Sequence, residues 1–252
     1  MSNVKTQIII TMAGFGQRFR DAGYDVPKYR IAVHDHTLLH WSLLSLKNFI
    51  AAGSKVVFIA RAADNARDFI AGEMPGLCIN DWSLVELPAP TDGQATTALK
   101  ALPAIAADQP FLVYNIDTFV NPAALPAAGP RGDGWVPCFP GAGAAWSFAR
   151  ATAGDTRIIE IREKKRISED ATIGLYWFRS GALYADLYRR FYASSERMEA
   201  GERYIAPMYN LLIEDGGAAH LHRVPLNAVY PLGIPADVEA FAKGPNPLSQ
   251  LS

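Results

Sequence analysis

Residues 8–19 are Ile-Ile-Ile-Thr-Met-Ala-Gly-Phe-Gly-Gln-Arg-Phe, and Pro27-Lys28 follows them after a short polar stretch. Ile8 to Thr11 is a run of β-branched residues, which is typical of a strand buried on both faces. Gly14 and Gly16 then allow a sharp turn and let the backbone approach a ligand closely. Since successive backbone N–H groups in such a turn bind anions, we predict a buried strand that ends in a polyphosphate loop.

Two cations, Arg18 and Lys28, lie near this loop in the sequence, and an arginine guanidinium is suited to a forked grip on phosphate. Glycine loops after a first strand are also common in proteins that bind no nucleotide, so this stretch alone leaves nucleotide binding open. It is not a Walker loop, because no Gly-Lys-Ser/Thr follows. Arg18-Phe19-Arg20 also stands where the dinucleotide-binding fingerprint has its third glycine.

The length of 252 residues suits one large α/β domain or two small ones, with a sizeable core. Hydrophobic residues make up 50% and charged residues 19%, which is typical of a globular protein. A net charge of −1 gives no reason to expect a nucleic-acid partner or an anionic membrane surface, and it is compatible with a homo-oligomer.

The cysteines, Cys78 and Cys138, are far apart and lack metal-site spacing, so we expect two buried free thiols in a reducing compartment. The first residues contain no signal-peptide segment, and no apolar run approaches the roughly 20 residues that span a bilayer. We therefore expect a cytoplasmic protein with no membrane partner.

The first half of the chain alternates apolar runs with amphipathic segments, which predicts right-handed βαβ units and a parallel sheet. Strands are expected at 55–60, 83–87 and 111–116. Helices are expected at 37–49, capped by Thr37, at 63–71, and after the loop 88–97 with Asp92 or Thr91 as the cap.

The second half changes character, because residues 129–143 are rich in glycine and proline and could form a linker. Strands of a more antiparallel region are expected at 144–149, 157–162, 172–178 and 220–224. Helices are expected at 181–192, 204–214 and 235–242, before a frayed tail at 244–252. Since neither half looks self-sufficient, we expect a single domain, 1–252, of two lobes, 1–128 and 129–243.

Asp117 follows the apolar run 111–116, and ligands of open parallel sheets bind outside the carboxyl ends of the strands. Gly14 ends the first strand at the same edge. An acid opposite a phosphate loop suits Mg²⁺ held between carboxylate and phosphate oxygens. The alternative is a carboxylate that caps the next turn.

Two other polar stretches are candidates for substrate binding. Gly93-Gln94 with Thr96-Thr97 places an amide and hydroxyls at a helix start, where they could contact a base edge or form a simple capped turn. The run Glu163-Lys164-Lys165-Arg166 could clamp a second phosphate or be a solvated turn. The five histidines lack metal-site spacing, so a metal site at His220 and His222 is the minor alternative. The tryptophans are expected in the core or in a pocket wall: Trp135, Trp146 and Trp177.

Together these segments resemble the nucleotidyltransferases that activate sugar phosphates. The motifs occur in the family's order as Met12–Phe19 with Pro27-Lys28, Gly93–Ala98, Asn115-Ile-Asp117, Glu163-Lys164 with Gly174–Phe178, and Gly233–Val238. Residues 146–148, 163–171 and 204–210 resemble a bacterial subgroup found among capsule and surface-polysaccharide genes. The resemblance implies an α/β fold, a Rossmann-like three-layer α/β/α sandwich of the glycosyltransferase-A kind with a mixed sheet.

The resemblance also implies a nucleotidyltransferase that moves NMP from an NTP, with a pyrimidine favoured, to a sugar phosphate or similar small phosphomonoester and releases pyrophosphate. Residues 1–128 would bind the nucleotide and residues 129–243 the acceptor. The implied catalytic residues are Arg18, Lys28, Asp117 and Lys164. The implied nucleotide-binding residues are Met12, Ala13, Gly14, Gly16, Gln94 and Thr97. The implied acceptor-binding residues are Trp146, Glu163, Lys164, Gly174, Tyr204 and Asn210.

Individual roles follow from the same resemblance. The glycine loop and Arg18 would hold the β- and γ-phosphates, Lys28 would neutralise the α-phosphate, and Gln94 would contact the base. Asp117 would hold Mg²⁺, with Mn²⁺ as the alternative ion. Lys164, oriented by Glu163, would hold the acceptor phosphate.

The chain departs from the family pattern in three places. Residues 230–233 lack the late acid that many members use as a second metal ligand. Either one protein carboxylate suffices, with phosphates and water completing the shell, or Asp237 contributes, although Asp237 more simply caps the last helix. Ile234 replaces the usual threonine. Tyr29-Arg30 follows Lys28 in place of Pro-Leu or Ala-Leu, so we expect a differently shaped loop there.

Two other functions stay open at this point. A nucleotide-sugar-dependent glycosyltransferase would share the fold, but it usually carries Asp-x-Asp, and this chain has Asn115-Ile-Asp117. A non-catalytic nucleotide-binding regulatory protein would explain the missing late acid. The cations Arg18 and Lys28 argue against both functions. The presence of Asp117 and Lys164 in addition to these cations argues against the second.

Overall fold

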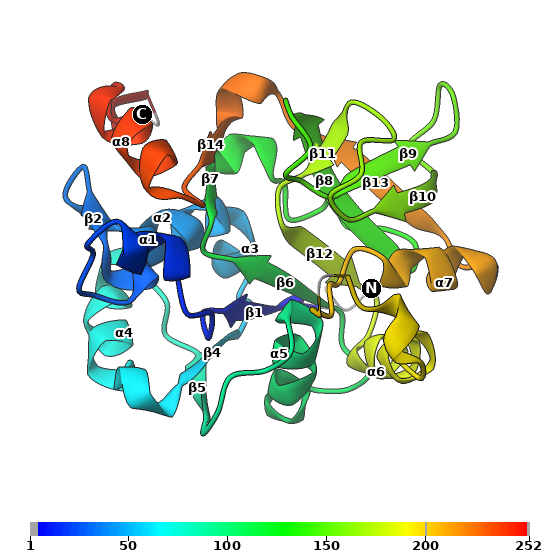
Figure 1. Cartoon of the computed structure of the whole chain (residues 1–252), viewed down its shortest axis with the longest axis horizontal. Coiled ribbons are helices and arrows are strands. Elements are labelled where there is room, and N and C mark those ends of the chain that lie inside the picture. The colour runs from blue at the N-terminus through cyan, green and yellow to red at the C-terminus, as the bar shows by residue number, and fades with distance from the viewer. Residues whose placement is uncertain (1–4, 200, 251–252) are drawn as a thin grey trace.

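A mixed β-sheet organises the computed structural model, which describes residues 5–199 and 201–250. Its strands are β1 (Gln7–Thr11), β4 (Val56–Arg61), β5 (Trp82–Leu87), β6 (Phe111–Asn115), β8 (Gly134–Pro140), β9 (Phe148–Ala151), β10 (Ile158–Arg162), β11 (Asp170–Thr172), β12 (Leu175–Phe178) and β13 (Ala219–Arg223). They lie in the order β10-β9-β11-β8-β12-β6-β1-β4-β5, with β13 beside β8 (Figure 1).

Helices cover both faces of this sheet (Figure 1). They are α1 (Gln17–Asp21), α2 (Leu38–Ser45), α3 (Lys47–Ala51), α4 (Arg67–Glu73), α5 (Gln94–Ala101), α6 (Gly181–Phe191), α7 (Met208–Glu214) and α8 (Pro235–Lys243). Two small ladders lie outside the sheet, β2 (Ala32–Val33) with β3 (His36–Thr37), and β7 (Thr118–Val120) with β14 (Val229–Pro231).

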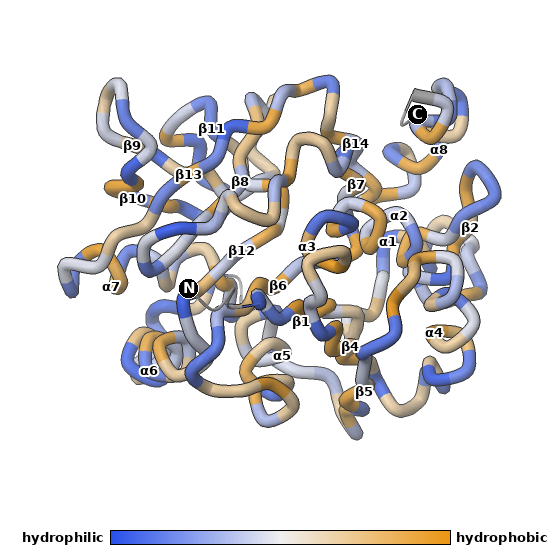
Figure 2. Tube along the Cα trace, turned by 180° about the vertical axis from the view of Figure 1, so that it is seen from behind, coloured by the Kyte–Doolittle hydropathy of each residue, from blue (hydrophilic) through white to orange (hydrophobic). Residues whose placement is uncertain are grey.

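The strand β1 lies at the centre of the parallel part, between β4 and β6, and is parallel to both. Its side chains alternate between faces, as the two-residue period of a strand requires. Ile8 and Ile10 belong to the core cluster that contains residues of α2, α3 and α4. Ile9 belongs to the cluster on the other face, with residues of α5, α6 and α7. Figure 2 shows β1 and β4 largely in hydrophobic colours, as expected for strands buried on both faces.

The predicted three-layer α/β/α fold with a mixed sheet is therefore confirmed. The strand β12 joins the two halves, because it runs antiparallel to β6 on one side and to β8 on the other. Antiparallel pairs continue through β11, β9 and β10. The division into lobes at residues 128 and 129 stays a prediction.

A third hydrophobic cluster holds the C-terminal helix α8 against the N-terminal half. Trp41 of α2 is fully buried there, and its ring centroid lies 4.8 Å from that of Phe119 and 5.2 Å from that of Phe241. Its indole N–H donates to the Val33 carbonyl at 3.0 Å. This packing fixes the segment that precedes α8 next to the end of β6.

Several element predictions were wrong in their bounds. The predicted helix 37–49 is α2 and α3, although Thr37 does cap it by accepting from the His40 N–H at 3.1 Å. Ser45 donates back to the Trp41 carbonyl at 3.2 Å and accepts from the Val120 N–H at 2.9 Å. A serine that bonds back to the fourth residue before it bends a helix, and this accounts for the break at Leu46.

Residues 129–143 do not form the linker that their composition left open, because they contain β8, a buried interior strand. The predicted strand at 144–149 is β9, which begins at Phe148, and the predicted helix at 63–71 is a 3₁₀ turn at Ala62–Asp64 followed by α4. In the tail, Pro247–Gln250 forms a 3₁₀ turn and Leu248 packs on the third cluster, while residues 251–252 lie outside the described residues.

The remaining corrections concern burial and length. Cys138 is buried and Cys78 is exposed, and both are free thiols, so the expected burial holds for Cys138 alone. The helix α7 begins at Met208, not at residue 204. Within residues 5–199 and 201–250, no helix is long and apolar enough to cross a bilayer.

Candidate active site

The glycine loop, residues 12–17, connects β1 to α1 at the carboxyl edge of the parallel strands. Met12 and Ala13 are buried, so any contact with a nucleotide would come from their backbone, whereas Gly14 is exposed. Gly16 has a φ of +62°, in the left-handed region that favours glycine. A Cβ at Gly16 would lie 3.4 Å from the Lys28 Cβ, so the loop and Lys28 are in close contact.

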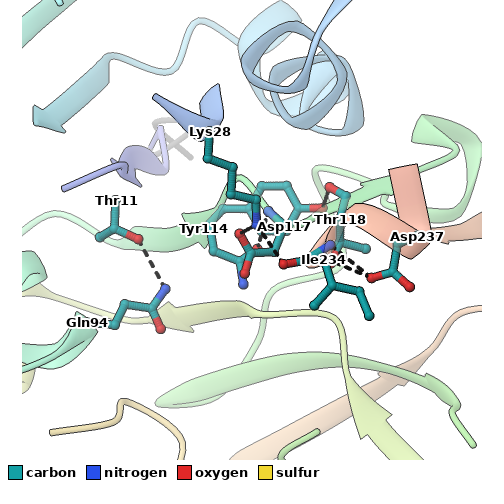
Figure 3. A network of polar contacts seen from close by, with 10 residues as sticks. Thr11, Lys28, Gln94, Tyr114, Asp117, Thr118, Ile234 and Asp237 are labelled. Atoms are coloured by element: carbon teal, nitrogen blue, oxygen red, sulfur yellow. Dashed lines mark hydrogen bonds and ion pairs between the residues drawn. The ribbon is translucent and has the colours of Figure 1, made fainter. Parts of the chain in front are cut away.

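Lys28 forms an ion pair with Asp117 across the edge of the sheet (Figure 3). The lysine side chain is 10% exposed and that of the aspartate 45%, so the pair faces solvent from the aspartate side. The Lys28 Nζ atom also lies 3.4 Å from the Gly233 carbonyl oxygen. The predicted catalytic pair is thus brought together from segments far apart in the sequence. Arg18 is exposed on α1 and bonds with no described side chain.

Hydrogen bonds of its backbone fix Asp117 in place, so its carboxylate is not needed to hold the turn. Its N–H donates to Asn115 Oδ1 at 3.2 Å, and its carbonyl accepts from the Leu232 N–H at 2.6 Å. The Tyr114 hydroxyl donates to the Thr118 carbonyl at 2.7 Å, which fixes the turn after β6 (Figure 3). The carboxylate is therefore aimed outward from a rigid turn.

The donor set around Asp117 fits a magnesium ion that is held by one carboxylate and by substrate phosphates. Asp117 Oδ2 accepts no hydrogen bond from any described residue. A Cβ at Gly233 would lie 3.9 Å from that oxygen and 3.7 Å from Asp237 Oδ2, so both carboxylates face the same glycine. Residues 5–199 and 201–250 hold no group of three or more His, Cys, Asp or Glu side chains suited to a metal.

Asp237 caps the last helix, as predicted. Its Oδ2 atom accepts from the Gly233 and Ile234 N–H groups, at 3.1 Å each (Figure 3). An acid in the first turn also suits the positive end of the helix dipole. This role occupies one of its carboxylate oxygens.

His220 and His222 were the minor alternative for a metal site. His220 contacts Thr156 Oγ1 at 3.2 Å, and His222 contacts the Ala124 carbonyl at 2.9 Å.

Residues 91–94, which we call the base loop after their predicted role, lead into α5. Neither Asp92 nor Thr91 caps that helix, because Gly93 occupies the N-cap position with a φ of +138°. Gln94 begins the helix, and its Nε2 donates to Thr11 Oγ1 at 3.2 Å (Figure 3). Thr97 is buried, with its hydroxyl 2.6 Å from that of Thr91. Gln94 therefore lies beside the end of β1, where the glycine loop begins.

Lys164, which is predicted to bind the acceptor, is exposed and has a φ of +47°, a conformation that few residues other than glycine adopt. Its Nζ donates to the Tyr204 hydroxyl at 2.7 Å and lies 4.7 Å from the centre of that ring. Glu163 is buried and accepts from Ser147 Oγ instead of pairing with Lys164. Burial raises the pKa of Glu163, against the effects of Ser147 and of the Lys164 charge. The partner that orients Lys164 is Tyr204.

The other predicted acceptor residues differ in what they can offer. Gly174 has a φ of +78° and packs against the Asn115 side chain, next to the Asp117 turn. Asn210 uses both of its amide atoms on the Ile161 backbone, at 2.9 and 2.8 Å, so it anchors β10 to α7. Trp146 is partly buried and edge-on to Phe139, with ring centroids 5.1 Å apart.

Two contact residues were missed from the sequence. Thr11 is a polar residue at the end of an apolar strand, and that position was a usable signal. Arg203 lies in no motif, yet its backbone and side chain contact the base loop. The loop after Lys28 is anchored as well, because Tyr29 is buried and Arg30 donates to the Asp64 and Asn65 carbonyls, at 2.9 Å each. The polar composition of residues 21–30 and Pro27 predict an exposed loop, and this prediction is wrong at Tyr29 and Arg30.

The strand order, the glycine loop and the acid after β6 define a Rossmann-like nucleotidyltransferase fold. No protein-family model and no curated protein matches the chain. Among solved structures, it is similar to the nucleoside-diphosphate-sugar pyrophosphorylase from Vibrio cholerae RC9, with 34% sequence identity and a TM-score of 0.88, over 94% of this chain and 100% of that one. The chain belongs to the nucleoside-diphosphate-sugar pyrophosphorylase family.

Two more distant structures share the fold. One is the inositol-1-phosphate CTP transferase from T. maritima, with 15% identity and a TM-score of 0.75, over 100% of this chain and 96% of that one. The other, from Bacillus anthracis, is assigned as a glucose-1-phosphate thymidylyltransferase and has 17% identity and a TM-score of 0.73, over 96% of each chain.

Proposed function

We propose that this protein transfers a nucleotidyl group from an NTP to a sugar phosphate or a similar small phosphomonoester. An acceptor phosphate oxygen forms a bond to the α-phosphorus, the bond from that phosphorus to the β-phosphate oxygen breaks, and pyrophosphate leaves. The observation that carries the proposal is the Lys28–Asp117 pair beside the glycine loop. A cation and an outward carboxylate beside a glycine loop suit a bound triphosphate with its metal ion.

The protein's part in this reaction is to position the reactants and to balance charge. Backbone N–H groups at Gly14 and Gly16, with Arg18, would hold the β- and γ-phosphates. Lys28 would exchange Asp117 for the α-phosphate when the NTP binds. Asp117 would hold Mg²⁺, with Mn²⁺ as the alternative, and the ion would neutralise phosphate charge.

Gln94 supports a role in base recognition. Its Nε2 is occupied by Thr11, and its Oε1 accepts no hydrogen bond from any described residue. That oxygen can accept from an N–H group on a base edge. Purines and pyrimidines both offer such a group, so Gln94 supports base recognition but does not select the base. We propose a pyrimidine nucleotide as the donor, as the resemblance to the family favours, and the panel of NTPs below tests this choice.

Lys164 supplies the cation for the acceptor phosphate. It is exposed, and its Nζ has one hydrogen-bond partner, Tyr204, among the described residues. An ammonium group has three donors, so capacity remains for a phosphate. We further propose that the product serves capsule or surface-polysaccharide synthesis in the cytoplasm, and that the protein could act as a homo-oligomer.

The experiment that tests this function is pyrophosphate release with Mg²⁺. CTP, UTP, dTTP, ATP and GTP would each be combined with a panel of sugar phosphates and other phosphomonoesters. Release that requires one NTP and one acceptor together supports the proposal and identifies the substrates. Measurable NTP binding without release from any pair would favour the non-catalytic alternative.

A further inference from the structure

Arg203 and Tyr204, which we call the positioning strap, lie between the base loop and Lys164. The Arg203 N–H donates to the Asp92 carbonyl at 2.7 Å, and the Arg203 carbonyl accepts from the Ala95 N–H at 3.0 Å. These two bonds enclose Gly93. A Cβ at Gly93 would lie 2.5 Å from both the N and the O atom of Arg203, so only glycine fits against the strap.

The Arg203 side chain holds the same loop a second time. Its Nε lies 3.2 Å from Asp92 Oδ2, as an ion pair. Its Nη1 donates to the Tyr188 hydroxyl at 2.6 Å, and the guanidinium lies 5.6 Å from the Tyr188 ring centre. The Tyr188 hydroxyl is in turn 2.7 Å from Thr96 Oγ1, in the first turn of α5. Arg203 therefore restrains the base loop directly, through Asp92, and the first turn of α5 through Tyr188.

Tyr204 holds the acceptor side. Its hydroxyl accepts from Lys164 Nζ, and its carbonyl accepts from the Tyr192 hydroxyl at 2.6 Å. Burial, together with the neighbouring Glu202, raises the pKa of Tyr204, so its hydroxyl stays protonated at neutral pH. The neutral Tyr204 hydroxyl can therefore orient the Lys164 ammonium group without neutralising its positive charge.

We propose that the strap couples the two substrate sites. Arg203 fixes the base loop, its chain neighbour Tyr204 fixes Lys164, and a nucleotide that orders the base loop thereby places Lys164 for the acceptor phosphate. Since coupling is reciprocal, a bound acceptor tightens nucleotide binding by the same factor. This inference rests on the proposed function and adds Arg203 and Tyr204 to it as positioning residues.

Calorimetric titration with CTP, UTP and dTTP in EDTA, so that no divalent ion supports the transfer, each with and without glucose 1-phosphate or inositol 1-phosphate, measures this coupling. For the wild-type protein we expect the Kd of one NTP to fall about tenfold when its acceptor is present, within the range typical of coupled sites. Arg203→Met should raise the Kd of that NTP and abolish the fall. Tyr204→Phe should leave the Kd of the NTP alone within about twofold and still abolish the fall.

Arg190→Met is the matched control. Arg190 lies on α6 like Tyr188, but it pairs outward with Asp186 and Asp215, so its replacement should leave the coupling intact. If Arg203→Met fails to fold, Tyr204→Phe decides the matter. A wild-type protein without coupling, or a Tyr204→Phe variant that keeps it, would overturn the strap. Absence of pyrophosphate release from the wild type would instead contradict the proposed function.

Discussion

The proposed nucleotide side and the proposed acceptor side of this molecule are built by different means. On the nucleotide side, the glycine loop and the Asp117 turn directly follow the parallel strands β1 and β6. On the acceptor side, Lys164 follows the edge strand β10, in a left-handed conformation, and its orientation depends on Tyr204 from another segment. The comparison teaches that the first region is specified locally and the second by tertiary contacts.

The largest effect is expected at the Lys28–Asp117 pair. Lys28→Ala and Asp117→Ala should each lower kcat by about 10²- to 10³-fold, the loss typical of removing one electrostatic group at a reacting phosphate. Steady-state pyrophosphate release measures this. Asp237→Asn is the control, since it retains an oxygen for the α8 cap and should keep most of the activity. An equal loss in that variant would instead make Asp237 a metal ligand.

A smaller effect, confined to one substrate, is expected at Lys164. Lys164→Met should raise the KM of the acceptor by about 10- to 100-fold, as for loss of a hydrogen bond to a charged group. The Kd of the NTP alone should change little. The adjacent and exposed Lys165 offers the matched variant Lys165→Met, with little expected change in either constant. If both variants behave alike, the run 163–166 acts only as a diffuse positive surface.

Thr11 tests how sharply the nucleotide side discriminates among bases. Thr11→Val keeps the shape of the side chain but removes the oxygen that orients Gln94, so discrimination between NTPs should fall about 2- to 10-fold. Thr11→Ser restores that oxygen and should restore discrimination. The ratio of kcat/KM values for two NTPs is the measurement. An unchanged ratio in Thr11→Val would show that Gln94 is not oriented by Thr11.

The smallest effect concerns stability and depends on pH. Burial raises the pKa of Glu163 in the folded protein. At a pH between the usual glutamate pKa and this raised value, Glu163 is protonated in the folded protein and ionised in the unfolded chain. Its ionisation therefore lowers the free energy of unfolding as pH rises from the usual glutamate pKa through the raised value. Glu163→Gln should remove this loss and unfold at a higher temperature than the wild type at pH 7.5.

The same pair of proteins should unfold at similar temperatures near pH 3.5, where Glu163 is protonated in both the folded and the unfolded state. Thermal denaturation followed by circular dichroism at the two pH values measures the difference. A Glu163→Gln variant that is less stable at pH 7.5 would show that the charged carboxylate is favourable where it lies.

Much of the fold could be predicted from the sequence, because the signals are local. The β-branched run Ile8 to Thr11 predicted the central strand, and the apolar run after Lys55 predicted its parallel neighbour. Lys28 and Asp117 were predicted from local signals, because Lys28 comes soon after the glycine loop and Asp117 directly follows the apolar run 111–116. The bounds of α2 were not predictable in this way, since the hydrogen bond that accompanies its end involves Val120, far along the chain.

The acceptor side was harder to predict for the same physical reason. Asn210 was expected to bind the acceptor, yet its amide is used by the Ile161 backbone, a partner that no local pattern reveals. Glu163 was expected to orient Lys164, but burial and Ser147 direct it inward. Arg203 carries no signal at all until the fold brings it to the base loop.

The most direct test of the account is ³¹P nuclear magnetic resonance of a single reaction mixture containing Mg²⁺, one NTP and one phosphomonoester from the productive pair. The account predicts that pyrophosphate and a pyrophosphate diester appear in equal amounts, and that Lys28→Ala and Asp117→Ala slow the formation of both by about 10²- to 10³-fold. Pyrophosphate with NMP and unchanged acceptor would show hydrolysis and contradict the transfer. No reaction of the NTP, together with release of a nucleoside diphosphate in a parallel mixture that contains a nucleotide sugar, would make the protein a glycosyltransferase.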